Sequence, residues 1–120
     1  IHGGSDHRIY DNLFVSCGGS VEVGTFSFLG QERFFDRTSG KFFTDAAKVP
    51  YDSGIWQSRY PELYELMHNA TDEELQYPRN NEVYGNTMIN TPDVVMSDLA
   101  RQYGKEYKNT VKQALFYKEK

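Results

Sequence analysis

The chain of 120 residues is acidic, with 17 Asp and Glu against 13 Lys and Arg, and 15% of its residues are aromatic. Its length suits one domain, and its aromatic content argues against a disordered chain. The net charge of −4 argues against nucleic acid as a partner, and no apolar run is long enough to predict a membrane span. The single cysteine, Cys17, has no partner for a disulfide or a zinc site and is expected to be a small buried residue.

Two distant stretches of the chain repeat one pattern. Residues 7–16 and 81–90 align without gaps at an offset of 74 positions, which matches Ile9 with Val83, Tyr10 with Tyr84, Asn12 with Asn86, Phe14 with Met88 and Val15 with Ile89. The β-branched and aromatic residues in both copies are typical of strands. In a solenoid such copies stack, and a stacked Asn bonds the neighbouring turn through its side-chain amide. The repeat therefore predicts stacked turns with a ladder of Asn12 and Asn86.

The offset also predicts a long insertion. One turn of such a solenoid takes on the order of 20–25 residues, so we place the strands of the turns in about 1–23 and 79–90 and an inserted loop in about 24–78. Within it, residues 26–43 form an aromatic, Gly-punctuated loop without a sustained period, and 58–67 predict a helix with Pro61 near its first turn. Thr71 and Glu74 have the spacing of a capping box that starts a short helical turn.

The C-terminal segment, 97–120, leaves two structures open. Leu99, Tyr103, Tyr107 and Val111 are spaced by four, which is a helical pattern, and Gly104 weakens it. The end of the segment fits a docked helix or a closing strand equally well.

Residues 1–18 resemble the turns of large bacterial right-handed parallel β-helix proteins of the pectate-lyase-like superfamily. Trp56 and the runs 59–63 and 78–81 resemble the long loop between turns in the same proteins. The resemblance implies a β fold: a right-handed parallel β-helix segment over 1–120, with a long insertion containing short helices, as a fragment of a longer protein. It also implies a secreted or periplasmic protein that acts on a polysaccharide. Lyases, glycoside hydrolases, epimerases and members without an assigned activity share this fold, so the fold does not choose among them.

The first candidate substrate-binding residues lie near the start of the chain, where His2, Asp6, His7 and Arg8 surround Gly3 and Gly4. His2 and Arg8 could neutralise a uronate carboxylate or move the proton that β-elimination requires. The alternative is purely structural, with this segment forming a corner in which Asp6 bonds backbone amides.

The second group of candidates lies in the insertion and comprises Arg33, Asp36, Arg37, Trp56 and Arg59. Long loops on a rigid scaffold commonly carry binding residues. Arg33 and Arg37 could grip a carboxylate together, and Trp56 could stack on a sugar ring. The alternative is that Trp56 covers the solenoid while the arginines pair with nearby acidic residues.

We expect a carbohydrate-active protein of the lyase or glycoside hydrolase type, without an assigned catalytic residue. A carboxylate pair for hydrolysis could come from Asp6, Asp11, Asp36, Asp45 or Asp52. The sequence has no Asp-x-Asp-x-Asp-Gly calcium loop, and we expect neither metal nor cofactor. One alternative is a non-catalytic carbohydrate-binding or structural segment, with self-association through exposed ends of the solenoid. Another is a compact α+β domain whose two similar stretches pair by chance.

Overall fold

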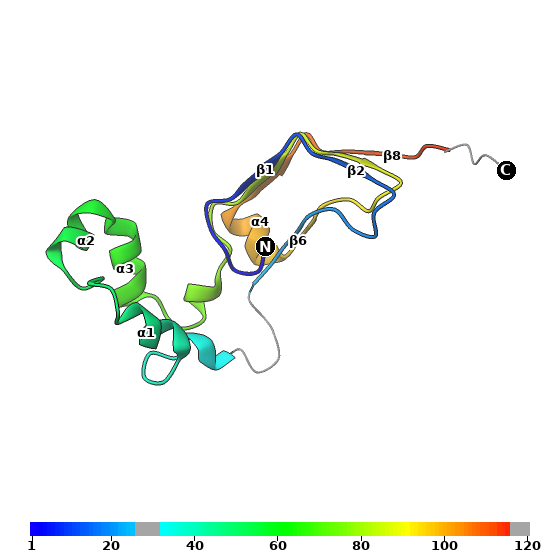
Figure 1. The fold of residues 1–120 in the computed structure, drawn as a ribbon. Coiled ribbons are helices and arrows are strands. Elements are labelled where there is room, and N and C mark those ends of the chain that lie inside the picture. Colours follow the sequence, from blue (N-terminus) through cyan, green and yellow to red (C-terminus); the bar gives the residue numbers. More distant parts are fainter. Residues whose placement is uncertain (26–31, 116–120) are drawn as a thin grey trace. The chain divides into compact units, whose positions relative to one another are not determined.

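The computed structural model describes residues 1–25 and 32–115 and divides the chain into two compact units (Figure 1). Ile1–Thr25 and Pro78–Lys120 form one of them, here called the stacked unit. Phe26–Tyr77 forms the other, here called the inserted unit. Residues far apart in the sequence therefore share the stacked unit, because the chain returns to it after the insertion.

The stacked unit consists of three small parallel sheets built from successive passes of the chain. The first pass contributes β1 (Arg8–Tyr10), β2 (Leu13–Val15) and β3 (Glu22–Val23), and the second contributes β4 (Glu82–Tyr84), β5 (Thr87–Ile89) and β6 (Val95–Met96). The third pass contributes β7 (Lys105–Tyr107) and β8 (Thr110–Lys112) after the helix α4 (Asp98–Tyr103). The strand orders are β1-β4-β7, β2-β5-β8 and β3-β6, and every pair is parallel.

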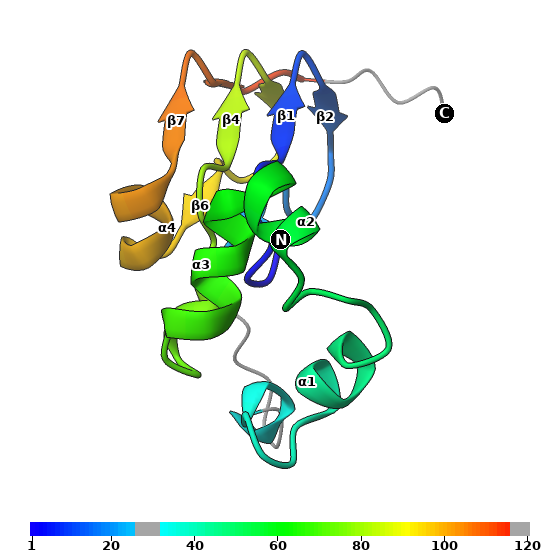
Figure 2. The same cartoon turned by 90° about the vertical axis from the view of Figure 1, so that its left-hand side faces the viewer.

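The strand register pairs the residues that the sequence repeat aligns. Ile9 lies opposite Val83 in β4, and Phe14 lies opposite Met88 in β5. In Figure 1 the backbones of the three passes follow one another closely, and in Figure 2 β1, β4 and β7 run side by side in the same direction. With its helices, the chain is a mixed α/β structure rather than an all-β one.

Three buried polar side chains of the second pass, Asn81, Asn86 and Thr91, bind the first pass to the second. They are spaced by five residues, and each side-chain oxygen accepts a backbone N–H at 3.0 Å from the residue 74 positions earlier: His7 for Asn81, Asn12 for Asn86 and Cys17 for Thr91. Burial strengthens such bonds because water does not compete for the same groups. The predicted ladder of Asn12 and Asn86 is therefore present.

The core of the stacked unit lies between the three sheets. Val83 and Met88 are fully buried, and Ile9 and Phe14 from the first pass pack against them. The other buried members are Val21, Val23, Val94, Met96 and Ala100. Because side chains alternate between the two faces of a strand, the middle residues of β4 and β5 point inward and their neighbours point outward.

The structure of the C-terminal segment is only partly the helix that the spacing of its apolar residues indicated. The helix α4 ends at Tyr103, and Tyr107 and Val111 lie in β7 and β8. Gly104 marks the change, because a Cβ atom there would lie 2.6 Å from the carbonyl oxygen of Asn81. The third pass can approach the second closely at this point only without a side chain. Residues 116–120 of this segment lie outside the described residues.

Cys17 was predicted to be buried, and this prediction was wrong. Its side chain is exposed, and its thiol lies 3.4 Å from the carbonyl oxygen of Val15. Cys17 instead contributes its backbone N–H to the ladder through Thr91.

The inserted unit contains short helices joined by turns. They are the 3₁₀ helices η1 (Glu32–Phe35) and η2 (Glu74–Gln76) and the α-helices α1 (Lys41–Ala46), α2 (Gly54–Arg59) and α3 (Pro61–Asn69). Part of the predicted aromatic loop 26–43 is thus helical, and its residues 26–31 lie outside the described part. The predicted helix over 58–67 is divided at Tyr60, and Pro61 opens α3.

The capping box is confirmed. The backbone N–H of Glu74 donates to the Thr71 hydroxyl at 3.1 Å, and the N–H of Thr71 donates to the Glu74 carboxylate at 2.8 Å. This reciprocal pair satisfies two amides that the short helix η2 cannot bond itself. Nowhere in the described residues does a helix have the length and apolar character needed to cross a membrane.

Candidate functional site

The outward face of the sheet β1-β4-β7 carries two rows of side chains that cross the three strands. The first row consists of Arg8, Glu82 and Lys105, which are paired in register. The second row consists of Tyr10, Tyr84 and Tyr107, also in register and hereafter called the tyrosine column. Because strands alternate their faces, both rows lie on the side opposite the core residues Ile9 and Val83.

The rings of the tyrosine column stack on one another. The ring centroids of Tyr10 and Tyr84 are 5.1 Å apart and those of Tyr84 and Tyr107 are 4.9 Å apart, with interplanar angles of 5° and 1°. Both faces of Tyr84 are therefore covered by its neighbours. Along its length the column therefore exposes ring edges and hydroxyl groups rather than ring faces.

The charged row alternates in sign. Arg8 Nε lies 3.3 Å from a carboxylate oxygen of Glu82, and the Tyr107 hydroxyl donates to the other at 3.5 Å. Burial, and then the charge of Glu82, raise the pKa of Tyr107 above its usual value of 10.0. Lys105 forms no ion pair within the part of the chain that the structure describes. Its ammonium group is thus available to a ligand.

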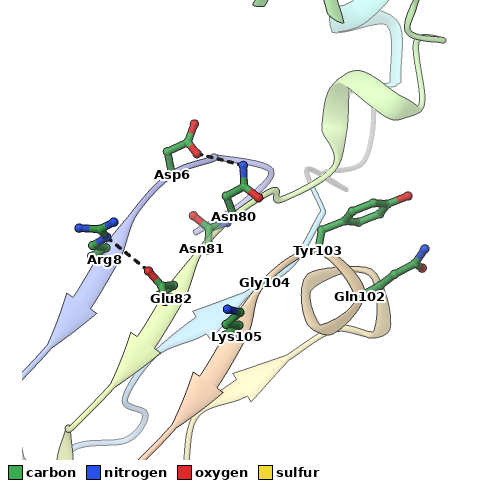
Figure 3. Close-up of a pocket in the computed structure, with 9 residues that line it drawn as sticks. All are labelled: Asp6, Arg8, Asn80, Asn81, Glu82, Gln102, Tyr103, Gly104 and Lys105. Carbon is green, nitrogen blue, oxygen red and sulfur yellow. Dashed lines mark hydrogen bonds and ion pairs between the residues drawn. The ribbon is translucent and has the colours of Figure 1, made fainter. Parts of the chain in front are cut away.

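A polar depression of about 600 Å³ lies at the start of these strands (Figure 3). Figure 3 shows side chains from β1, β4 and β7, from the turns that precede them and from the end of α4 around it. The lining residues are Asp6, Arg8, Asn80, Asn81, Glu82, Gln102, Tyr103, Gly104 and Lys105. They offer carboxylates, amides and cations together, which can bind a ligand rich in hydroxyl groups through both donors and acceptors.

The turn residues of the depression are fixed by contacts between passes. Asp6 and Asn80 occupy equivalent positions in the first and second passes, and both have a left-handed backbone, with φ of 63° and 56°. The Asn80 amide donates to the Asp6 carboxylate at 3.2 Å. Asp and Asn tolerate this backbone region better than most residues, which explains their presence at both corners.

Only some of the predicted N-terminal candidates line the depression. Asp6 and Arg8 line it. His7 is exposed and donates its backbone N–H to Asn81, and His2 forms an isolated parallel bridge with Gly24. The structure therefore brings Asp6 and Arg8 to one site, and neither histidine lines that site.

Two of the predicted candidates in the insertion have local structural contacts. Arg37 donates to the carbonyl oxygens of Met67, at 2.6 Å, and Ala70, at the end of α3. Asp36 accepts hydrogen bonds from the Thr38 and Ser39 backbone and hydroxyl groups, which lower its pKa to about 2. These contacts secure the turns of the inserted unit, so Arg37 is not positioned to grip a ligand together with Arg33.

The other candidates of the inserted unit lie on its surface. Trp56 is half-buried in α2, with its ring centroid 5.2 Å from that of Tyr60. Arg33 in η1 and Arg59 at the end of α2 are exposed. Neither Trp56 nor these arginines belong to the stacked unit that carries the depression.

Several residues of the depression were not predicted, namely Asn80, Asn81, Glu82, Gln102, Tyr103 and Lys105. The position of Lys105 could have been predicted from the sequence, because the pattern Tyr-x-Asn occurs at Tyr84 and again at Tyr107. Lys105 precedes the second of these by the same two residues that separate Glu82 from Tyr84. Aligning this third copy would have placed Lys105 beside Glu82.

The inserted unit has one histidine, His68, with acceptors at both ring nitrogens. Nδ1 lies 2.7 Å from the carbonyl oxygen of Tyr64, and Nε2 lies 2.5 Å from the Asp52 carboxylate. A carbonyl and a carboxylate only accept, so the imidazolium form satisfies both contacts. The hydrogen bond to Tyr64, followed by that to Asp52, raises the pKa of His68 above 6.5, although burial and Arg37 oppose the shift.

We expect the inserted unit to lose stability as pH rises through the folded-state pKa of His68. The pKa is higher in the folded than in the unfolded state, so the stabilisation is complete below the unfolded value of about 6.5 and disappears above the folded value. Urea unfolding followed by Trp56 fluorescence at about pH 6 and about pH 9 measures this loss. The variant H68Q should show a smaller difference between the two pH values, and an unchanged difference would contradict the assignment to His68.

No group of three or more His, Cys, Asp or Glu side chains that could hold a metal occurs in residues 1–25 and 32–115. Comparison of the chain with known proteins found no matching family model, no matching curated protein and no matching solved structure.

Proposed function

We propose that the stacked unit is three turns of a right-handed parallel β-helix of the pectate-lyase-like type, and that its outward face binds a polysaccharide. The resemblance of residues 1–18 to the turns of such proteins supports this proposal. The parallel register of β1 with β4 and of β4 with β7 supports it further, because successive turns of a β-helix pair in this way. The protein would be secreted or periplasmic, where such polysaccharides occur.

The observation that carries the proposal is the polar depression beside the charged row. Its carboxylates and amides line the same depression as Lys105, and Figure 3 shows the strands and turns from which they come. A sugar chain presents hydroxyl groups that donate and accept, and such a mixed lining can pair with both. The tyrosine column adds ring edges and hydroxyl groups to the same face rather than an open ring for stacking.

Binding is the function that this geometry supports best. The carboxylate of Asp6 is held by Asn80 and that of Glu82 by Arg8 and Tyr107, so both are fixed as acceptors. Cleavage is a second candidate, because Asp6 and Glu82 line one depression and paired carboxylates serve glycoside hydrolysis. β-Elimination would instead need a base close to the sugar, and neither His2 nor His7 lines the depression.

A panel of plant and bacterial polysaccharides tests the two candidates together. Affinity electrophoresis detects binding, while ultraviolet absorbance of unsaturated products and the appearance of reducing ends are followed on the same samples. Retarded migration without new ends supports binding. Reducing ends with absorbance indicate a lyase, and reducing ends alone indicate a hydrolase. A folded chain that neither binds nor cleaves any member of the panel would contradict the proposal.

The variant K105A should weaken binding to a retained polysaccharide about fivefold. Lys105 lines the depression and is exposed, so its removal costs on the order of 1 kcal/mol of binding free energy. The matched control is K112A, because Lys112 is also an exposed strand lysine of the third pass and does not line the depression. Equal losses in both variants would show that net charge, rather than the depression, governs binding.

A further inference from the structure

The four charged side chains that line the depression differ in how they are paired. Arg8 and Glu82 pair with each other, with 3.3 Å between Arg8 Nε and a carboxylate oxygen of Glu82. Asp6 and Lys105 are exposed, and neither forms an ion pair with any residue of 1–25 and 32–115. The depression therefore offers a ligand one uncompensated negative charge and one uncompensated positive charge.

The carboxylate of Asp6 is held in place by neutral groups. The Asn80 amide donates to it at 3.2 Å, and the backbone N–H of Asp6 donates to the carbonyl oxygen of Arg79 at 2.9 Å. The guanidinium of Arg79 lies over the Tyr103 ring, 5.3 Å from its centroid, and does not line the depression. A carboxylate can accept several hydrogen bonds, so Asp6 keeps both its charge and further acceptor capacity.

Asp6 and Lys105 come from different strands of the face. Figure 3 shows Asp6 in the turn before β1 and Lys105 in β7, and β4 lies between these two strands. Lys105 is in register with Glu82 and Arg8, and Asp6 precedes Arg8 by two residues. Strands lie about 4.8 Å apart and each residue advances about 3.3 Å, which places the two backbone positions roughly 12 Å apart. One sugar ring is shorter than this distance, so the two charges suit groups on different sugars.

We infer that the ligand of the depression is a zwitterionic glycan, that is, a sugar chain that carries both carboxylate and ammonium groups. This inference rests on the proposed binding of a polysaccharide. Lys105 donates to the carboxylate of one sugar, and Asp6 accepts from the ammonium group of another. The pair of Arg8 and Glu82 is internally compensated and serves hydroxyl groups.

The two uncompensated charges select against glycans of a single sign. A purely anionic glycan pairs with Lys105 but also brings carboxylates towards Asp6, and a purely cationic glycan brings ammonium groups towards Lys105. Attraction to one residue is then opposed by repulsion from the other. A zwitterionic chain avoids both repulsions, and each exposed ion pair that it gains is worth about fivefold in affinity.

Four glycans of different charge test this inference by titration calorimetry on the full chain. Pullulan is neutral, hyaluronan carries carboxylates, chitosan carries amines, and N-deacetylated hyaluronan carries both. A buffer of about pH 6 keeps the amines largely protonated. We expect N-deacetylated hyaluronan to bind about fivefold more tightly than hyaluronan or chitosan, which each satisfy one charge only.

The outcomes separate this inference from the proposed function. If pullulan bound as tightly as N-deacetylated hyaluronan, the charges would not be used, and the inference would be overturned while polysaccharide binding stood. A folded chain that bound none of the four glycans would overturn both.

Two variants should change the affinities in a crossed pattern. D6N should lower the affinity for chitosan about fivefold without lowering that for hyaluronan, and K105Q should do the reverse. Both positions are exposed, and Asn tolerates the left-handed backbone of position 6, so circular dichroism should show folded chains. Losses for the same glycan in both variants would overturn the inference.

D11N and K112Q are the matched controls, because they make the same changes in net charge. Asp11 is exposed in the first pass and has a left-handed backbone like Asp6, with φ of 55°, and Lys112 is an exposed strand lysine like Lys105. Neither control residue lines the depression. We expect both control variants to rank the four glycans as the parent does. If D11N weakened chitosan binding as much as D6N, or K112Q weakened hyaluronan binding as much as K105Q, net charge would govern binding and the inference would be overturned.

Discussion

Replacing Asn86 with alanine should lower the free energy of unfolding of the stacked unit by about 2–4 kcal/mol. The Asn86 side chain is fully buried and bonds both neighbouring passes, accepting from Asn12 and donating to Asn109 and Ile9. Alanine would leave these groups without partners, and each buried polar group left unpaired costs about 1–3 kcal/mol. Urea unfolding followed by far-ultraviolet circular dichroism measures the loss.

The variant N12A is the matched control for this prediction. Asn12 stands in the same ladder with its side chain exposed, so water can replace the bonds that alanine removes. Its expected loss is about 0.5–1.5 kcal/mol. Trp56 fluorescence distinguishes the two units, because this residue lies in the inserted unit. Equal losses of unfolding free energy for N86A and N12A would contradict the burial of Asn86 between the neighbouring passes.

Replacing Met88 with alanine should lower the free energy of unfolding by about 2–5 kcal/mol. Met88 is fully buried in the core cluster and lies in register between Phe14 and Val111. Truncation leaves a cavity that the flanking passes cannot fill without leaving their register, which adds to the lost burial of apolar surface. The measurement is the same urea titration, followed by circular dichroism.

The neighbouring variant L13A provides the comparison for Met88. Leu13 begins β2, is 63% exposed, and is equally large and apolar. Truncating an exposed side chain changes stability by about 0.5 kcal/mol or less. If L13A were as destabilising as M88A, the inward and outward faces of the sheet β2-β5-β8 would be assigned wrongly.

The pairing of the first two passes could be predicted from the sequence because several kinds of residue recur at the same offset. The aliphatic, aromatic and Asn positions of 7–16 recur in 81–90, and the strands pair at that offset. The third pass was missed because its inward position holds Glu106, where Ile9 and Val83 stand in the other two. A charged residue at that position hides the aliphatic pattern, although Tyr107 and Asn109 preserve the rest.

The inserted unit shows why short helices are hard to predict. The helix α1 spans only Lys41–Ala46, too few residues for a clear period. Arg37 was assigned to ligand binding on its charge, yet its guanidinium closes the end of α3. The sequence cannot distinguish these roles, because the carbonyls that Arg37 binds lie about 30 residues away.

The candidate site could be predicted only in part because its residues come from separate parts of the chain. Asp6 and Arg8 were identified because they are close in sequence. Glu82 and Lys105 join them through the parallel register of three separate passes. That register becomes visible in the sequence only when the third Tyr-x-Asn copy is aligned with the other two. The depression is thus a property of the stacked strands rather than of one motif.

Nuclear Overhauser effects between tyrosine rings measure whether the three passes stack in register. Selective labelling of the tyrosines, with assignment by single Tyr-to-Phe variants, resolves the rings of Tyr10, Tyr84 and Tyr107. Stacking in register predicts cross-peaks from Tyr84 to both other rings, whose centroids lie 5.1 and 4.9 Å away. A folded chain in which Tyr84 lacks contact with either ring would contradict it and would favour a compact domain whose repeat is fortuitous.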